Sequence, residues 1–168
     1  MILKLSQLKY KVDRLAKEVG ASRDMLPTFG HSQQSGRPNL EVDSRGYHYV
    51  IAERGHEFER HTTMDLDELL YMIFAHVTFS LSIKYELAHR VEAQDGRRIM
   101  FPHQIELLSR LSSKWAEQAS LEHERRLKQH PFDDYASIRA TLAGSLSEKG
   151  YSEEEISKMI YRKYPLPE

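Results

Sequence analysis

Four residues in the second half of the chain have the types and spacings of metal ligands. Glu86 and His89 form a Glu-x-x-His pair, which places two ligands on one helix face in di-iron bundles. His123 and the glutamate after it begin like a zinc-protease motif, but Leu127 stands where the second histidine belongs, and His130 follows only later. A metal-dependent enzyme that uses Glu86, His89, His123 and His130 is one interpretation, although neither motif is complete and we expect no metal or cofactor.

Other catalytic chemistry finds no support in the sequence. The chain has no cysteine, which excludes disulfides, thiolate metal sites and a cysteine nucleophile. It contains no Gly-x-Ser-x-Gly motif for a serine nucleophile and no glycine-rich loop with a following lysine for phosphate. The residue types therefore favour a protein that acts without covalent chemistry.

Two short basic pairs, Arg97–Arg98 and Arg125–Arg126, could contact nucleic acid. Binding to a phosphate backbone normally uses a broader basic stripe with stacking aromatics. The 168 residues include 24 Lys and Arg against 25 Asp and Glu, a net charge of −1, which argues against a general phosphate-binding surface. A small nucleic-acid-binding regulator that uses these arginines is the second and less favoured alternative.

A charged hairpin near the middle of the chain is the strongest candidate for a binding surface. Its charges have a simple structural explanation, because charged side chains on an exposed strand prevent edge-to-edge aggregation. They also suit a recognition surface in which an aromatic residue and arginines act as anchors. We predict that the partner-binding residues are Glu53, Arg54, Glu57, Phe58, Glu59 and Arg60.

Alternating side chains predict three short strands around this hairpin, at about 39–43, 47–53 and 57–62. Gly46 and Gly55 fall in the two turns between the strands, where glycine supplies a positive φ angle. A meander of this size, over residues 39–62, is not stable by itself and must pack against helices.

Apolar stripes at helical spacing predict helices on both sides of the meander. The first covers residues 1–20 and ends at Gly20, and a loop follows at 22–38. The other helices fall within 65–164. We expect one helix from 65 to about 93, a second with Pro102 in its first turn, a third over 113–130, and two more after Pro131.

Two further residue patterns refine this picture. Ser152 and Glu155 form a capping box at the start of the last helix. Trp115, the only tryptophan, is expected to be a core anchor rather than part of an interface. The prediction is a single α+β domain over residues 1–168, with a small antiparallel three-stranded meander packed on a bundle of five to six helices.

The chain is expected to be cytoplasmic and to have no membrane partner. Its first fifteen residues carry three lysines and an arginine among apolar residues, without the uninterrupted apolar core of a signal peptide. No window of the sequence approaches the roughly 20 apolar residues that a membrane span needs.

Three pieces of the chain resemble bacterial Imm63-like immunity proteins. They are YHYVIAERGHEFERHTTMDLDELLYMIF, then ELAHR with QDGRRIMFPHQIELLSRLSSKW, then LKQHPFDD, and together they extend from Tyr47 to Asp134. The resemblance implies an α+β fold, a bacterial cytoplasm and a cognate toxin domain as partner, and it supplies no catalytic residues. The resulting hypothesis is a non-enzymatic immunity protein that binds and blocks a toxin encoded beside it.

Overall fold

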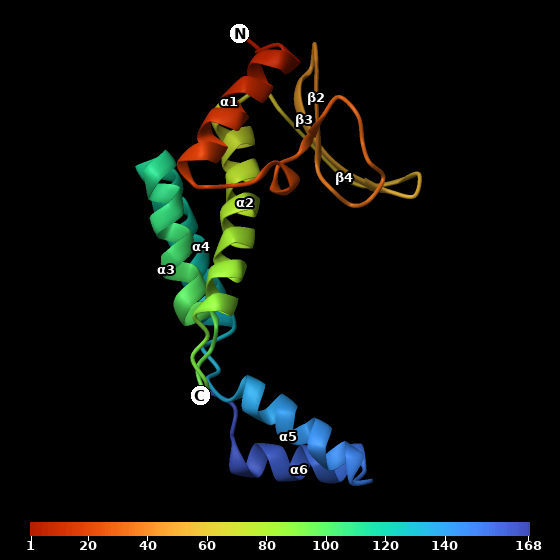
Figure 1. Cartoon of the computed structure of the whole chain (residues 1–168), viewed down its shortest axis with the longest axis vertical. Helices are drawn as coiled ribbons and strands as arrows, with labels where there is room; N and C mark the ends of the chain where they lie inside the picture. The colour runs from red at the N-terminus through yellow and green to blue at the C-terminus, as the bar shows by residue number, and fades with distance from the viewer. The chain divides into compact units, whose positions relative to one another are not determined.

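The computed structural model describes residues 1–168 and contains a four-stranded sheet in the order β1-β2-β3-β4 (Figure 1). The strands are β1 Thr28–Phe29, β2 Asn39–Asp43, β3 Gly46–Glu53 and β4 His56–Thr63. The first pair is parallel and the other two pairs are antiparallel. The three predicted strands are confirmed to within one residue, but the sheet has a fourth strand. The sequence-based prediction misses β1 because two residues show no alternation.

The central strand β3 is buried on both faces. Tyr47, His48, Tyr49 and Val50 are all almost inaccessible to solvent. The Tyr47 hydroxyl reaches the N-terminal segment and accepts a hydrogen bond from the backbone N–H of Leu3, at 2.8 Å. Alternation along β3 is as predicted, and the position of the strand inside the sheet explains why its polar residues are buried as well.

Six α-helices complete the α+β fold, which confirms the predicted class. They are α1 Leu5–Glu18, α2 Leu66–Ala88, α3 Arg97–Leu111, α4 Ser113–Gln129, α5 Ala136–Glu148 and α6 Glu153–Lys163, and a short 3₁₀ turn spans Arg23–Met25. The helix predicted to reach about residue 93 ends five residues earlier, at Ala88. The predicted start at Pro102 is also wrong, because Asp95 accepts a hydrogen bond from the N–H of Arg97 and starts α3 there, which leaves Pro102 inside the helix.

The chain divides into two compact units, each described by itself. Unit 1 comprises Met1–Leu81 and Gln104–Glu117. In Figure 1, α1 and the strands of this unit lie around the N-terminal half of α2. Its core is apolar and includes Leu8, Val12, Leu40, Leu69, Ile73, Phe74, Val77, Leu108 and Trp115. Trp115 is 4% exposed and stacks on Phe74 with ring centroids 6.2 Å apart, so it is a core residue.

Unit 2 comprises Ser82–His103 and Gln118–Glu168. Its helices α5 and α6 lie side by side (Figure 1) and share a small core of Leu146, Ile156 and Ile160. The predicted capping box is present, because the Ser152 hydroxyl accepts from the N–H of Glu155 while the Glu155 carboxylate accepts from the N–H of Ser152. The single-domain organisation of residues 1–168 stays a prediction.

Helix α2 is apolar enough and long enough to cross a membrane by length and composition. The prediction that no segment of the sequence is apolar enough to span a membrane was therefore wrong. In the structure 44% of the apolar window is buried inside the protein, and its buried residues include Leu69, Ile73 and Val77 of the unit 1 core. Burial in a core demands the same apolar composition as burial in lipid, which explains why α2 meets both descriptions.

Candidate protein-binding surface

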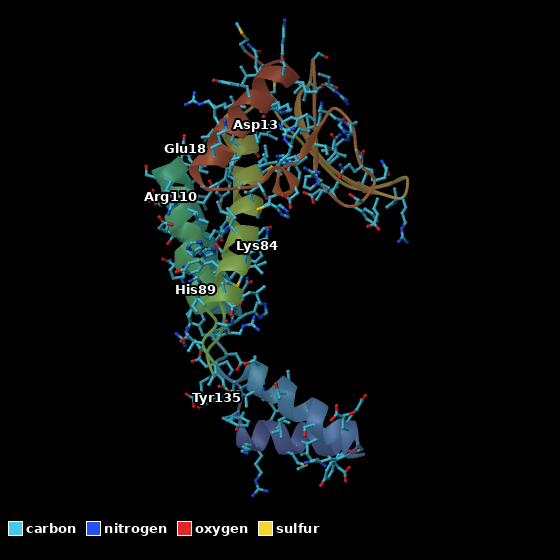
Figure 2. All side chains as sticks on the ribbon, in the orientation of Figure 1. Asp13, Glu18, Lys84, His89, Arg110 and Tyr135 are labelled. Atoms are coloured by element: carbon cyan, nitrogen blue, oxygen red, sulfur yellow. The ribbon has the colours of Figure 1, made fainter.

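All six residues predicted to bind a partner lie on the β3–β4 hairpin. We call Glu53, Arg54, Glu57, Phe58, Glu59 and Arg60 the hairpin surface. Strand β4 is at the end of the strand order, so one of its edges has no neighbouring strand. Residues 56–60 are all exposed, and side chains project from the ribbon on both sides of the hairpin (Figure 2). The fold therefore gathers the predicted residues on one accessible edge of unit 1.

The turn at the hairpin tip is held in place by a preceding loop. Arg54 and Gly55 have φ angles of 51° and 80°, which are the two positive values of a type I′ turn. The N–H of Gly55 donates to Oε1 of Gln34 at 2.7 Å, and the N–H of Arg54 donates to the Gln34 carbonyl at 3.2 Å. The tip is thus preorganised by residues about twenty positions away, a support that the sequence did not indicate.

A β-bulge places Phe58 at the surface. Ile51 pairs with Glu59 and Ala52 pairs with Glu57, so Phe58 is an extra residue on β4 with no partner in β3. Its side chain is 63% exposed, and the His56 ring meets it edge-on at a centroid distance of 4.6 Å. An exposed aromatic ring on a supported backbone is the kind of residue that anchors protein interfaces.

The charges of the hairpin surface are not equivalent. Arg60 donates to both oxygens of Glu57, at 2.8 and 2.9 Å, and to Glu41 on β2 at 3.0 Å. Hydrogen bonds from Arg60 lower the pKa of Glu57. Glu59 has no ion pair with a basic side chain, and burial together with the Glu59 charge raises the pKa of Tyr49 to about 12. The net character of the edge is therefore acidic.

A buried histidine attaches β4 to the rest of the sheet. His48 is 1% exposed, and its Nδ1 lies 2.8 Å from Oγ1 of Thr62 while its Nε2 lies 2.9 Å from Oδ1 of Asp43. Hydrogen bonds from Arg45 and from His48 lower the pKa of the Asp43 carboxyl. Sequence reasoning missed this support, because His48 belongs to an ordinary strand pattern and its partners are brought close only by strand register.

The first two candidate metal ligands have other roles in unit 2. Glu86 accepts two hydrogen bonds from Arg90, both at 2.9 Å, and these lower its pKa. His89, labelled in Figure 2 at the end of α2, stacks on Tyr85 at 4.1 Å, and its Nδ1 lies 2.8 Å from the Tyr85 carbonyl oxygen. Both side chains therefore serve the local structure of the helix end.

The other two candidates are no closer to a metal site. His123 is buried against Phe101, with ring centroids 3.9 Å apart, and burial lowers its pKa. His130 is exposed at the end of α4. No group of three or more His, Asp or Glu side chains is arranged to hold a metal ion. The structure does not bring the four candidates together.

The basic pair Arg97–Arg98 is occupied by ion pairs within unit 2. Arg97 contacts Asp95 at 2.7 Å, and Arg98 contacts Asp134 at 2.8 Å. The guanidinium groups of both arginines also lie over the Phe132 ring, so they connect the start of α3 to the loop before α5. Arg125 and Arg126 are exposed on α4. The arginines proposed for nucleic acid are thus divided between structural ion pairs and a helix surface.

Unit 2 contains an open cleft of about 860 Å³ among these ion pairs. Its charged walls include Glu86, Arg90, Asp95, Arg97 and Asp133. Each of these side chains already has an ion-pair partner of opposite charge in unit 2. These five charges are therefore part of the ion pairs that hold unit 2 together.

Comparison with known proteins identifies one family. The family model described as Immunity protein 63 matches residues 43–125, about half of the chain. No curated protein and no solved structure matches the chain. The matched segment contains the whole hairpin surface, whereas α1, α5 and α6 lie outside it.

Proposed function

Through residues 43–125 the chain belongs to the Immunity protein 63 family, and on this premise we propose that it binds a cognate bacterial toxin and neutralises it by covering the toxin's active surface. Proteins of this family are non-enzymatic. We also propose that the complex forms in the bacterial cytoplasm, where a toxin encoded beside the gene would otherwise act.

One observation carries the proposed location of the interface. Within the matched segment, the hairpin surface combines an exposed aromatic residue, an acidic edge and a backbone held by Gln34 and His48. A preorganised surface loses less conformational entropy on binding, so more of the contact energy appears as affinity. An interface of about 800 Å² on each partner can then hold a toxin tightly.

The function is tested by co-expression with the toxin domain encoded beside this gene. We expect cells that express both proteins to grow, and the two proteins to co-purify in a stable complex. Cells that die despite expression of the folded chain, together with the absence of a complex in a pull-down, would contradict the proposed function.

The location of the interface is tested by charge reversal at Glu57 and Glu59. We expect the double variant Glu57→Lys, Glu59→Lys to bind the toxin domain about 10- to 100-fold more weakly, mainly through slower association, because acidic side chains steer a basic partner. Arg60 is left intact because it also bonds Glu41 on β2, a contact that this variant keeps. Surface plasmon resonance measures both rate constants.

A matched control changes the same charge elsewhere on the chain. Glu117 and Glu124 are exposed on α4, so the variant Glu117→Lys, Glu124→Lys alters the net charge equally. It should keep the association rate within about twofold of wild type, since local and not total charge directs the encounter. Equal losses in both variants would remove the hairpin surface from the interface.

A further inference from the structure

The open edge of β4 has backbone groups that face away from the sheet. On the opposite side of β3, the N–H of Gly36 donates to the carbonyl of Ala52 at 3.0 Å. Alternate residues of an antiparallel strand direct their N–H and C=O groups to opposite neighbours. Ala52, Val50 and His48 therefore bond toward β2, and the residues between them bond toward β4.

This alternation identifies the outward-facing residues of β4. Arg60 is paired with Val50 and Thr62 is paired with His48. Since Val50 and His48 turn toward β2, the N–H and C=O groups of Arg60 and Thr62 turn toward the open edge. No backbone hydrogen bond outside the ladder of the sheet involves these two residues. They present two donors and two acceptors at the spacing of one additional strand.

Both ends of β4 are fixed while this edge stays open. At the tip, Gly55 is bound to Gln34. At the other end, the Thr63 hydroxyl donates to Glu68 at 2.6 Å, and Nε2 of His61 lies 3.0 Å from the same carboxylate. An eight-residue strand held in this way is a ready template for an added strand.

We propose that β4 binds its partner by strand addition: an extended, basic segment of the toxin pairs with the Arg60–Thr62 edge, and an apolar side chain beside it packs on Phe58. This inference rests on the proposed function and specifies how the hairpin surface would recognise its partner. The unpaired carboxylate of Glu59 favours a segment that carries lysine or arginine.

The test separates the backbone of Arg60 from its side chain. Arg60→Ala removes the guanidinium and keeps the N–H, whereas Arg60→Pro also removes the N–H, which an edge strand tolerates when that group faces outward. Against the catalytically inactivated toxin domain encoded beside this gene, we expect Arg60→Pro to bind roughly 10- to 100-fold more weakly than Arg60→Ala. Equal affinities of the two variants, by calorimetry, would overturn strand addition.

A second measurement does not depend on how the proline variant folds. In the wild-type complex we expect amide hydrogen exchange at Arg60 and Thr62 to slow by about 100-fold or more, since these N–H groups become bonded to the partner. Exchange at the rates of the free protein would overturn the proposal. His61 and Thr63 are internal controls, because their N–H groups already face β3.

Two further outcomes distinguish the failures. If wild type forms no complex with the toxin domain, the proposed function fails and strand addition fails with it. If the complex forms but Arg60→Pro and Arg60→Ala bind alike, only strand addition fails. Light scattering of the protein alone should show the same oligomeric state for wild type and Arg60→Pro. A wild-type dimer that becomes a monomer in Arg60→Pro would assign the edge to a second copy and overturn the proposal.

Discussion

Gly46, at the start of β3, lies close to the backbone at the end of β4. Its φ angle is 134°, and a Cβ atom placed on it would lie 2.4 Å from the carbonyl oxygen of Thr63 at the end of β4. Gly55, in the next turn, has a φ of 80° but no atom within 4 Å of such a Cβ. Glycine is therefore required at position 55 for its backbone angle alone, and at position 46 for both its backbone angle and the close approach of the Thr63 carbonyl.

The residue-scale prediction compares alanine at these two positions. We expect Gly46→Ala to lower the free energy of unfolding by about 2–3 kcal/mol, because it adds a clash with a main-chain carbonyl to the strain of the positive φ. Gly55→Ala, which adds strain only, should cost about 1 kcal/mol. Urea titrations followed by circular dichroism measure both values, and a smaller loss at Gly46 than at Gly55 would contradict the assignment.

At the scale of elements, the first turn of α2 connects a strand and a helix. Glu68 binds the end of β4 through Thr63. Its neighbour Asp67 accepts hydrogen bonds from Nζ of Lys114, at 2.6 Å, and from Nε1 of Trp115, at 3.0 Å, at the start of α4. Acidic residues suit this turn because they face the positive end of the helix dipole. Both carboxylates thus lie in the first turn of α2 and orient its neighbours, while the Asp65 carboxylate caps the helix by accepting from the N–H of Asp67 at 2.8 Å.

The element-scale prediction concerns Trp115. Replacement by Ala should cost about 3–5 kcal/mol of unfolding free energy, because it removes a buried ring that stacks on Phe74. Trp115→Phe keeps most of the ring contact and loses the hydrogen bond to Asp67, so it should cost about 1 kcal/mol. If Trp115→Phe is as damaging as Trp115→Ala, the hydrogen bond and not the stacking dominates this contact.

For the molecule as a whole, the carboxylates in ion pairs make the free energy of unfolding depend on pH at acidic pH. The largely buried Asp95 is an example: burial by itself would raise its pKa, but hydrogen bonds from Arg97 and from the N–H groups of Asp133 and Arg97 lower it to about 2. A carboxyl with a lower pKa in the folded state binds fewer protons than in the unfolded state. Its contribution to stability is therefore complete above about pH 4 and is lost as the pH falls toward 2.

The whole-molecule prediction follows from this sign. Asp95→Asn should lower the free energy of unfolding by about 2 kcal/mol at pH 7, and the difference from wild type should shrink toward zero near pH 2. Glu124→Gln, at an exposed residue of α4, is the control and should match wild type at both pH values. A constant difference between Asp95→Asn and wild type across this pH range would show that the charge of Asp95 does not matter.

Local patterns explain how much could be predicted from the sequence. The last helix begins with Ser152 and Glu155 as expected, because both capping partners lie within one turn. The hairpin surface could be located because alternation and the Arg54–Gly55 turn are also local. The α+β class and membership of a non-enzymatic family could likewise be predicted from this single sequence.

Only the tertiary structure decided which distant groups meet. Strand β1, the His48–Thr62 contact and the Arg60–Glu41 ion pair join residues between 11 and 19 positions apart. Such pairs depend on strand register and on parallel pairing, which leave no periodic signal in the residues themselves. For the same reason the outward direction of the Arg60 and Thr62 backbone, on which strand addition depends, could be read only from the assembled sheet.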